Sequence, residues 1–307
     1  MNQRIGPGLL ISLLMVGTCV SSYAQASEKG SVVEVPFNFY KNEIILPVKI
    51  NADVTVSMML DTGADPSAID LATAKVVGLK LDQIGRPGSG GGSGVKLTYA
   101  TKLPLLEIGE LVAKDIEAVA IDLSLISQRL GMPIHGVLGH SLLNGRIVQI
   151  DYPRRIVRFL STSPSRTLTS GPNTQQRTVL KFRYEENVLI DDVTVNGKKL
   201  VGNLDTGSDG TFKLTPPAVS YLGLEGQYSK APISPSVGYI GVAQNREGQL
   251  GNVTVGAISV DGPPVIFFGK GSGRDKKAWG INIGNEFLKD YVVTIDYRKK
   301  LITLEKE

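Results

Sequence analysis

Residues 54–64 read VTVSMMLDTGA, and residues 198–208 read KKLVGNLDTGS. Each stretch is an alternating apolar run that leads into Asp-Thr-Gly, which begins at Asp61 in the first copy and at Asp205 in the second. Such alternation is typical of a strand with one buried face, and the polar, glycine-containing triplet after it indicates a tight turn. One Asp-Thr-Gly is unremarkable in a chain of this length, but two in matched context indicate an internal duplication.

The segments downstream of the two turns repeat as well. Residues 137–143, VLGHSLL, parallel residues 282–288, NIGNEFL, and each segment is followed by two strand-like runs joined by a charged turn. The aspartate of the first triplet lies 78 residues before the glycine of VLGHSLL, and that of the second lies 79 residues before the glycine of NIGNEFL. Matched spacing over such a separation predicts two copies of one structural unit.

Short alternating runs dominate the chain, and helical periodicity is sparse. We therefore predict an all-β fold of two pseudo-symmetric lobes with a cleft between them. The lobes are expected over residues 27–160 and 179–307. Residues 161–178, rich in Ser, Thr, Pro and Arg, are expected to form the linker between them.

The N-terminus has the features of an export signal. Arg4 precedes an apolar run over residues 9–20, and small residues follow up to Ala26. The run is shorter than the roughly 20 apolar residues that a membrane-spanning helix needs, so residues 1–26 are predicted to be a signal peptide. The mature chain is then expected in the periplasm, or else outside the cell, with no stable insertion into the membrane. Two alternatives keep the chain tethered, namely retention of the apolar run as a membrane anchor and lipidation of Cys19.

Charge and composition exclude several classes of function. The net charge is +4, from 33 Lys and Arg against 29 Asp and Glu, with no clustered basic run, which argues against nucleic-acid binding. A single cysteine rules out an intrachain disulfide and a cysteine-ligated zinc site. The two histidines, His135 and His140, have no evident third ligand nearby. We therefore expect neither a metal nor another cofactor.

The two Asp-Thr-Gly turns can form one site if the lobes pack about a local two-fold axis. Glycine would let the turns approach closely, and Asp61 and Asp205 would then lie side by side. Two adjacent carboxylates cannot both ionise easily, so one proton is shared between them. The ionised member can take a proton from a bound water while the protonated member donates to a substrate carbonyl. This chemistry requires no metal, cofactor or covalent intermediate.

With these turns the chain resembles the aspartic peptidases, both retropepsin-like and pepsin-like, over nearly the whole mature sequence. The resemblance is carried by the two DTG[AS] turns and by a hydrophobic-hydrophobic-glycine segment in each lobe. Residues 137–139, VLG, fit the pattern of that segment fully. Residues 282–284, NIG, depart from it at their first position, Asn282.

The resemblance implies two acid-protease-type β lobes, a polypeptide substrate, and Asp61 and Asp205 as the catalytic pair. Thr62 and Thr206 are implied to interlock the two turns through their hydroxyls. The remaining supporting residues of the site are Gly63, Gly207 and Ser208. Since both lobes lie in one chain, dimerisation is not required, and we expect a monomer.

The two turns differ at their fourth residue, which is Ala64 in the first and Ser208 in the second. Only Ser208 can offer a hydroxyl to its neighbouring aspartate, and a hydrogen bond to a carboxylate favours the ionised form. We therefore expect Asp205 to be the ionised member of the pair.

A substrate-covering flap is expected in each lobe. In lobe one it corresponds to residues 85–94, a glycine-rich stretch with no aromatic residue at its tip, and Tyr99 is the nearest aromatic candidate for substrate binding. In lobe two the counterpart is residues 234–242, with Tyr239.

Other polar and aromatic features are expected to be structural. Asp65 and Asp209, directly after the turns, are assigned capping or surface roles. The basic, glycine-rich residues 269–274 are expected to form a solvated loop. Trp279, the only tryptophan, is expected to pack in a core, with a substrate subsite as the alternative.

The sequence therefore predicts an exported aspartic endopeptidase. The rival hypothesis is a catalytically silent peptide-binding protein of the cell envelope that keeps the same fold. The retained threonines and glycines of both turns argue against the rival. The glycine-rich flap argues for it, because a loose lid positions substrate poorly.

Overall fold

The computed structural model describes residues 32–51, 53–88, 90–160, 176–269, 272–274 and 276–306. The expected signal peptide and most of the expected linker lie outside these residues. Within the described part of the chain, no helix is long and apolar enough to span a membrane.

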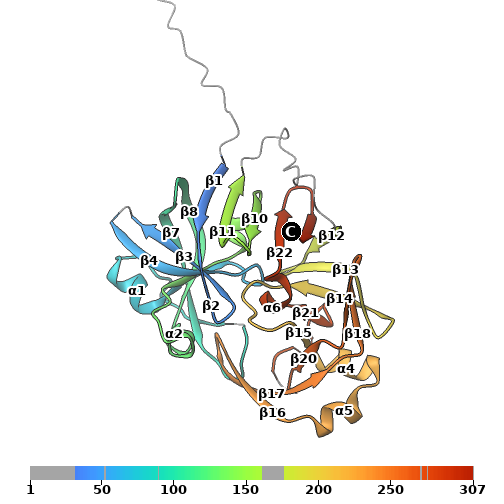
Figure 1. The fold of residues 1–307 in the computed structure, drawn as a ribbon. Coiled ribbons are helices and arrows are strands. Elements are labelled where there is room, and N and C mark those ends of the chain that lie inside the picture. Colours follow the sequence, from blue (N-terminus) through green and yellow to red (C-terminus); the bar gives the residue numbers. More distant parts are fainter. Residues whose placement is uncertain are drawn as a thin grey trace, which may run out of the picture.

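Lobe one is built on an eight-stranded sheet in the order β2-β3-β4-β9-β5-β8-β7-β6, and an additional pairing of β3 with β7 folds this sheet back on itself (Figure 1). The elements of this half are β1 (Val32–Pro36), β2 (Asn38–Tyr40), β3 (Glu43–Ile50), β4 (Val54–Leu60), β5 (Ser67–Asp70), α1 (Leu71–Val76), β6 (Arg86–Pro87), β7 (Leu97–Ile108), β8 (Leu111–Ile121), α2 (Ser124–Leu130), β9 (Gly136–Leu138), α3 (His140–Leu143), β10 (Ile147–Asp151) and β11 (Ile156–Leu160).

Lobe two contains the sheet path β12-β13-β14-β21-β15-β20-β17-β16, with β18 paired to β13 and β19 paired to β18. Its elements are β12 (Gln176–Tyr184), β13 (Val188–Val195), β14 (Lys198–Leu204), β15 (Phe212–Leu214), α4 (Pro216–Leu222), α5 (Glu225–Lys230), β16 (Ile233–Gly238), β17 (Gly241–Gln249), β18 (Asn252–Val255), β19 (Ile258–Asp261), β20 (Pro264–Phe267), β21 (Ile281–Ile283), α6 (Asn285–Leu288), β22 (Tyr291–Asp296) and β23 (Leu301–Lys306).

The two lobes share one strand arrangement. The strand that ends at Asp-Thr-Gly lies parallel to the strand of the glycine segment, as β4 with β9 in lobe one and β14 with β21 in lobe two. The next strand is antiparallel in both lobes (β5 on β9, β15 on β21), and the one after it is parallel (β8 on β5, β20 on β15). The predicted all-β fold of two pseudo-symmetric lobes is thus confirmed.

Strands from both halves join the lobes into one sheet. The order β1-β11-β10-β22-β23-β12 runs from lobe one into lobe two, and β10 pairs antiparallel with β22 at the junction. There Gln149 lies opposite Thr294, and its Nε2 donates to Thr294 Oγ1 at 3.0 Å. Figure 1 shows these strands in the upper part of the molecule, with β4, β7 and β8 of lobe one to their left and β15 to β17 and β20 of lobe two below them.

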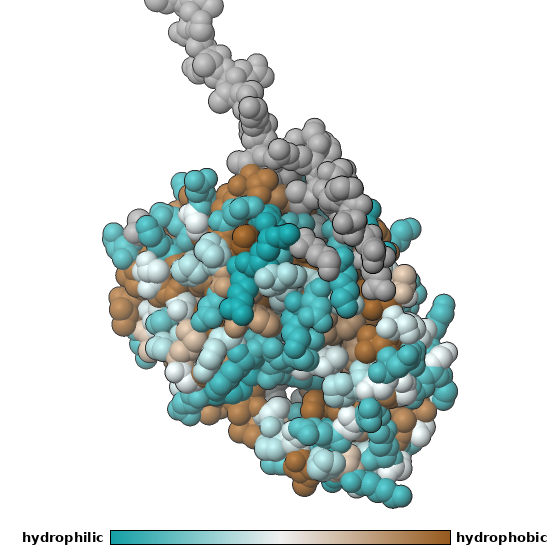
Figure 2. Space-filling model, in the orientation of Figure 1, coloured by the Kyte–Doolittle hydropathy of each residue, from teal (hydrophilic) through white to brown (hydrophobic). Residues whose placement is uncertain are grey.

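Local sequence explains the hairpins and the cores. Asn196 and Gly197 join β13 to β14 with φ values of 49° and 79°, the left-handed conformation that an Asn-Gly hairpin turn needs. On β4, Val56, Met58 and Leu60 are buried in the main core, while Met59 is buried on the opposite face in a second cluster. Figure 2 shows the outer face, where hydrophilic side chains surround small hydrophobic patches.

Candidate active site

The two Asp-Thr-Gly turns meet between the lobes and are joined by reciprocal hydrogen bonds. Thr62 Oγ1 donates to the carbonyl of Leu204 at 2.8 Å, and Thr206 Oγ1 donates to the carbonyl of Leu60 at 2.9 Å. Each hydroxyl also accepts from the backbone N–H of the other threonine, at 3.0 and 3.1 Å. Both threonines are buried, so these four bonds fix the two turns against each other.

Glycine is required where the turns touch. A Cβ on Gly63 would lie 2.7 Å from Asp205 Oδ1, and a Cβ on Gly207 would overlap the carboxyl group of Asp61. Each glycine therefore faces the aspartate of the other lobe. The close approach that the sequence predicts from Asp-Thr-Gly has this physical origin.

Each aspartate is held by donors to both of its oxygens. Asp61 Oδ1 accepts from Gly63 N at 2.7 Å, and Asp205 Oδ1 accepts from Gly207 N at 3.0 Å. The outer oxygens have different donors, because Asp61 Oδ2 accepts from the hydroxyl of Tyr239 at 2.7 Å whereas Asp205 Oδ2 accepts from Asn282 Nδ2 at 2.6 Å. Burial, and next the negative charge of Asp205, raise the pKa of Asp61 to about 8.

Ser208 does not make the hydrogen bond to Asp205 that the sequence predicts. Its Oγ is buried without a hydrogen-bond partner among the described residues. The side chain lies against the glycine segment instead, where a Cβ on Gly284 would stand 3.0 Å from this Oγ. The donor to Asp205 is Asn282, and the only sequence signal for it was the departure from the hydrophobic pattern at that position.

Of the two tyrosines proposed from the sequence, only Tyr239 lies at the aspartate pair. It stands at the tip of the β16–β17 hairpin, 178 positions from Asp61 in sequence. Burial of its hydroxyl and the charge of Asp61 raise the pKa of Tyr239 well above its ordinary value. Tyr99 pairs with Ala120 between β7 and β8, and its ring lies beside Gly85.

The tip of the lobe-two hairpin contacts the glycine-rich loop of lobe one. Ile240 N donates to the carbonyl of Gly91 at 3.0 Å, and Ser93 N donates to the carbonyl of Val242 at 3.2 Å. A Cβ on Gly238 would overlap the backbone of Gly91, so side chains are excluded from this contact. The two expected flap segments therefore meet each other, with the hairpin tip hydrogen-bonded to Asp61.

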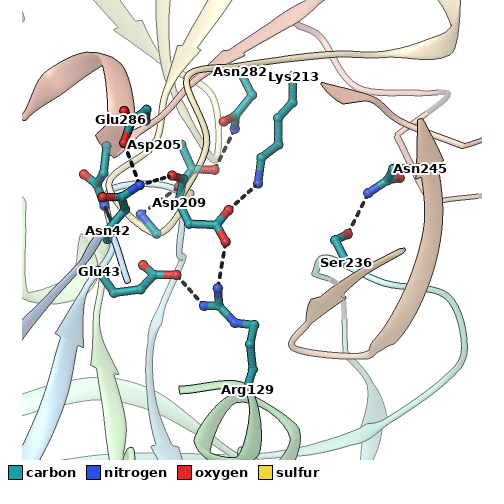
Figure 3. A network of polar contacts seen from close by, with 12 residues as sticks. Asn42, Glu43, Arg129, Asp205, Asp209, Lys213, Ser236, Asn245, Asn282 and Glu286 are labelled. Atoms are coloured by element: carbon teal, nitrogen blue, oxygen red, sulfur yellow. Dashed lines mark hydrogen bonds and ion pairs between the residues drawn. The ribbon is translucent and has the colours of Figure 1, made fainter. Parts of the chain in front are cut away.

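A network of charges joins the lobes next to the site (Figure 3). Arg129 on α2 binds Glu43 through Nη2 and, at 2.8 Å, Asp209 through Nη1, while Lys213 binds Asp209 at 2.9 Å. Burial raises the pKa of Glu43 to about 8 despite the charge of Arg129. Burial opposes ionisation of Asp209 too, but Lys213 and Arg129 outweigh it and lower the pKa. Asp209 thus bridges the lobes, a role beyond simple capping.

The histidines serve other contacts. His135 Nδ1 accepts from Ser57 N at 3.2 Å, and the His140 ring stacks on Tyr184 with centroids 3.5 Å apart. Asp65, which follows the first turn, accepts from the hydroxyl of Tyr184 at 2.9 Å. Among the residues that the structure describes, no group of His, Cys, Asp and Glu has the arrangement of a metal site.

A comparison with protein-family models finds the same duplication. The model described as aspartyl protease matches the chain twice, over residues 46–142 and 192–287. Each match contains one Asp-Thr-Gly turn and its glycine segment. Among curated proteins, none is similar enough in sequence to count as a match. Since the two matches together cover more than half of the sequence, this chain belongs to the aspartyl protease family.

Proposed function

We propose that the protein is an exported aspartic endopeptidase that cleaves polypeptides with a water activated by Asp61 and Asp205. One observation carries the proposal. The two aspartates stand in turns that are locked together by reciprocal threonine hydrogen bonds. The glycine of each turn lies against the carboxyl group of the aspartate in the other turn. This arrangement holds two acids beside each other, with one proton between them, in the way that general acid–base hydrolysis requires.

The hydrogen bond from Asn282 to Asp205 and the burial of Asp61 beside the charge of Asp205 support different roles for the two aspartates. The amide of Asn282 can only donate to Asp205, which stabilises the ionised form of that carboxylate. Asp61, whose pKa is raised to about 8, retains its proton below that pH. Asp205 is therefore the base and Asp61 the acid, and Asn282 takes the part that the sequence assigns to Ser208.

The reaction balances without any further group. Asp205 takes a proton from water, the resulting hydroxide adds to the substrate carbonyl carbon, and Asp61 gives its proton to the carbonyl oxygen. In the second step Asp205 passes its proton to the nitrogen of the tetrahedral diol and the C–N bond breaks. A hydroxyl of the diol returns a proton to Asp61. The products are a carboxylic acid and an amine, and the starting protonation of the pair is restored.

The substrate takes the place of Tyr239 at Asp61. A carbonyl oxygen that accepts the proton of Asp61 needs the position that the phenol occupies, so the β16–β17 hairpin has to move when substrate binds. The outer edge of β16 is the end of its sheet and can pair with an extended peptide.

The test compares the purified protein with Asp61→Asn and Asp205→Asn in a complex peptide library, from acidic to neutral pH. New peptide termini are counted by mass spectrometry. We expect cleavage by the parent and none by either variant, with both variants folded by circular dichroism. Intact peptides at every pH with the parent would favour the rival, a silent peptide-binding protein, and cleavage that survives in both variants would exclude the aspartate pair as catalyst.

Export to the periplasm is part of the proposal and rests on residues 1–26. Fractionation of cells that carry the full chain, beside a chain that lacks these residues, tests it. We expect the full chain in the periplasmic fraction and the shortened one in the cytoplasm. Membrane association that is lost in Cys19→Ser would establish lipidation instead.

A further inference from the structure

The sequence predicts a solvated loop over the basic residues 269–274, but Arg274, one of the described residues of this segment, is not fully solvated. Arg274 is half-buried, and its Nε is fully enclosed. Its guanidinium lies over two aromatic rings, with Cζ 5.5 Å from the ring centre of Phe268 and 5.8 Å from that of Trp279. Contact with two aromatic rings holds a guanidinium group in place.

Arg274 has an aromatic support but no anion. Within the described residues no hydrogen bond or ion pair engages its side chain, and the enclosed Nε is without an acceptor. By contrast Arg129, Arg158 and Arg183 each bind a carboxylate. Removing a cation from water without a partner is costly, so a guanidinium held in this way indicates a site for an anionic ligand.

The position of Arg274 connects it to the aspartate pair. Its Nη2 lies 3.6 Å from the point that a Cβ on Gly91 would occupy, so it reaches the loop that meets the hairpin tip. On its other side, Trp279 Nε1 donates to Asn187 Oδ1 at 3.1 Å, and Asn187 Nδ2 lies 3.4 Å from the carbonyl of Gly63 in the first turn. Burial lowers the pKa of Arg274, while the charges of Asp205 and Asp61 raise it, which places it in their field.

We propose that Arg274 binds a carboxylate of the substrate peptide close to the cleaved bond. The inference rests on the proposed peptidase function and adds a substrate class, namely peptides with an acidic group at a fixed position. Trp279 and Phe268 hold the guanidinium in place, and its planar set of N–H groups can bind both oxygens of a carboxylate together. Trp279 then has both roles that the sequence left open, since it packs in lobe two and supports a subsite.

The carboxylate can come from an acidic side chain or from the end of the peptide. A peptide that the wild-type protein cleaves is therefore resynthesised with Glu or Gln at each position near the cleaved bond, and with its C-terminus as acid or amide. The measured quantity is the ratio of kcat/KM between the acidic and neutral members of each pair. We expect one pair to show a ratio of about tenfold or more in favour of the acid, the usual effect of a charge-assisted hydrogen bond.

The variants are Arg274→Met, which keeps an unbranched apolar stem over the rings, and Arg274→Lys, which keeps the charge without the planar group. We expect the ratio to fall to near one in the methionine variant and to an intermediate value in the lysine variant. The matched control is Arg246→Met. Arg246 also lies over a ring, that of Tyr228, but donates to the carbonyl of Ala231, so its loss should leave the ratio unchanged.

The outcomes separate this inference from the proposed function. A wild-type protein that cleaves no peptide contradicts the peptidase proposal itself. Cleavage without any preference for an acidic member, or a preference that persists in Arg274→Met, contradicts the carboxylate site. An equal loss of kcat/KM on acidic and neutral peptides in Arg274→Met would also overturn the carboxylate site, because Arg274 would then act on the aspartates rather than on the substrate. If Arg274→Met does not fold, the same ratio is measured in Arg274→Lys, where a value below that of the wild type supports the carboxylate site and an unchanged value contradicts it.

Discussion

The two lobes share a backbone arrangement but differ in the side chains beside the aspartates. In lobe one the cross-strand row Ile45–Met59–Val137 is apolar and belongs to one buried cluster. The equivalent row of lobe two is Leu189–Asn203–Asn282, in which both asparagines are buried. The next position along the row is Ala68 in lobe one and Lys213 in lobe two. Duplication has therefore preserved the frame, while a few substitutions make the two aspartates chemically different.

Asn203 and Asn282 show the extent of this difference. Each has a buried Oδ1 without a hydrogen-bond partner among the described residues. Buried polar atoms without partners are destabilising, so these asparagines are not explained by stability. The hydrogen bond from Asn282 to Asp205 gives Asn282 a functional reason under the proposed mechanism, in which it favours Asp205 as the base.

The largest loss of activity is expected from substitutions at the glycines where the two turns touch. In Gly207→Ala the new methyl group overlaps the carboxyl group of Asp61 and pushes the two acids apart. Displacement of a catalytic group by an ångström costs about a hundredfold, so we expect kcat to fall by at least that factor. Gly63→Ala should behave alike, because its Cβ would lie 2.7 Å from Asp205.

The control for this substitution is Gly226→Ala on α5. A Cβ there meets nothing within 4 Å, and alanine favours a helix. Activity should stay at the parental value and stability should rise slightly. Full activity in Gly207→Ala would contradict the close contact between the turns.

The next largest effect is expected on stability, at the threonine interlock that the two lobes share. Thr62→Val leaves the carbonyl of Leu204 and the N–H of Thr206 without their buried partner, and Thr206→Val does the same to the other turn. We expect each variant to lose about 2–5 kcal/mol of unfolding free energy in urea, because two buried polar groups become unpaired. The two losses should be alike. A large loss in only one variant would show that one lobe dominates the interlock.

Much of the fold and part of the site follow from local patterns. Alternating apolar runs, the Asn-Gly hairpin and the repeated turns suffice to predict two β lobes and to place Asp61 and Asp205 together. The interlock follows as well, because a two-fold arrangement brings each threonine to the backbone of the other turn. These features depend on residues next to one another in sequence or related by the duplication.

The remaining features depend on packing between distant segments. The Oγ of Ser208 lies beside Gly284, a neighbour that the turn sequence alone does not reveal. Tyr239 reaches Asp61 only because the hairpin crosses from the other lobe, and Arg274 is enclosed only because Phe268 and Trp279 lie beside it. A pattern of hydrophobicity contains no information on such contacts. Asn282 was visible in the sequence as a departure from the hydrophobic-hydrophobic-glycine pattern, but its hydrogen-bond acceptor, Asp205, was not.

The asymmetric part of the comparison predicts opposite shifts in the pH profile of kcat/KM. Asn282→Val removes a donor that favours ionised Asp205, so the acidic limb should move up by about 1 pH unit. Val137→Asn adds an amide at the equivalent position of lobe one, which favours ionised Asp61 and should move the alkaline limb down. The same limb moving in both variants would contradict the assignment of base and acid.

The smallest effect concerns the pH dependence of stability. The pKa of Asp61 is raised from 3.8 to about 8, so the unfolded chain releases this proton at lower pH than the folded protein. Stability should therefore fall as the pH rises through that window, and Asp61→Asn should flatten the fall, as followed by Tm. Glu43, raised from 4.5 to about 8, leaves a residual slope of the same sign.

Asp122, in the same lobe as Asp61, has a pKa that is shifted in the opposite direction and is the comparison for this test. The pKa of Asp122 is lowered from 3.8 to about 2 by hydrogen bonds from Ser124 and Lys96. It contributes stability above its unfolded value that is lost as the pH falls towards 2, so Asp122→Asn should destabilise the protein at neutral pH and not at low pH. Parallel Tm curves for the parent and Asp61→Asn would show that Asp61 ionises as an ordinary carboxyl. Lobe one would then lack the acid that distinguishes it from lobe two.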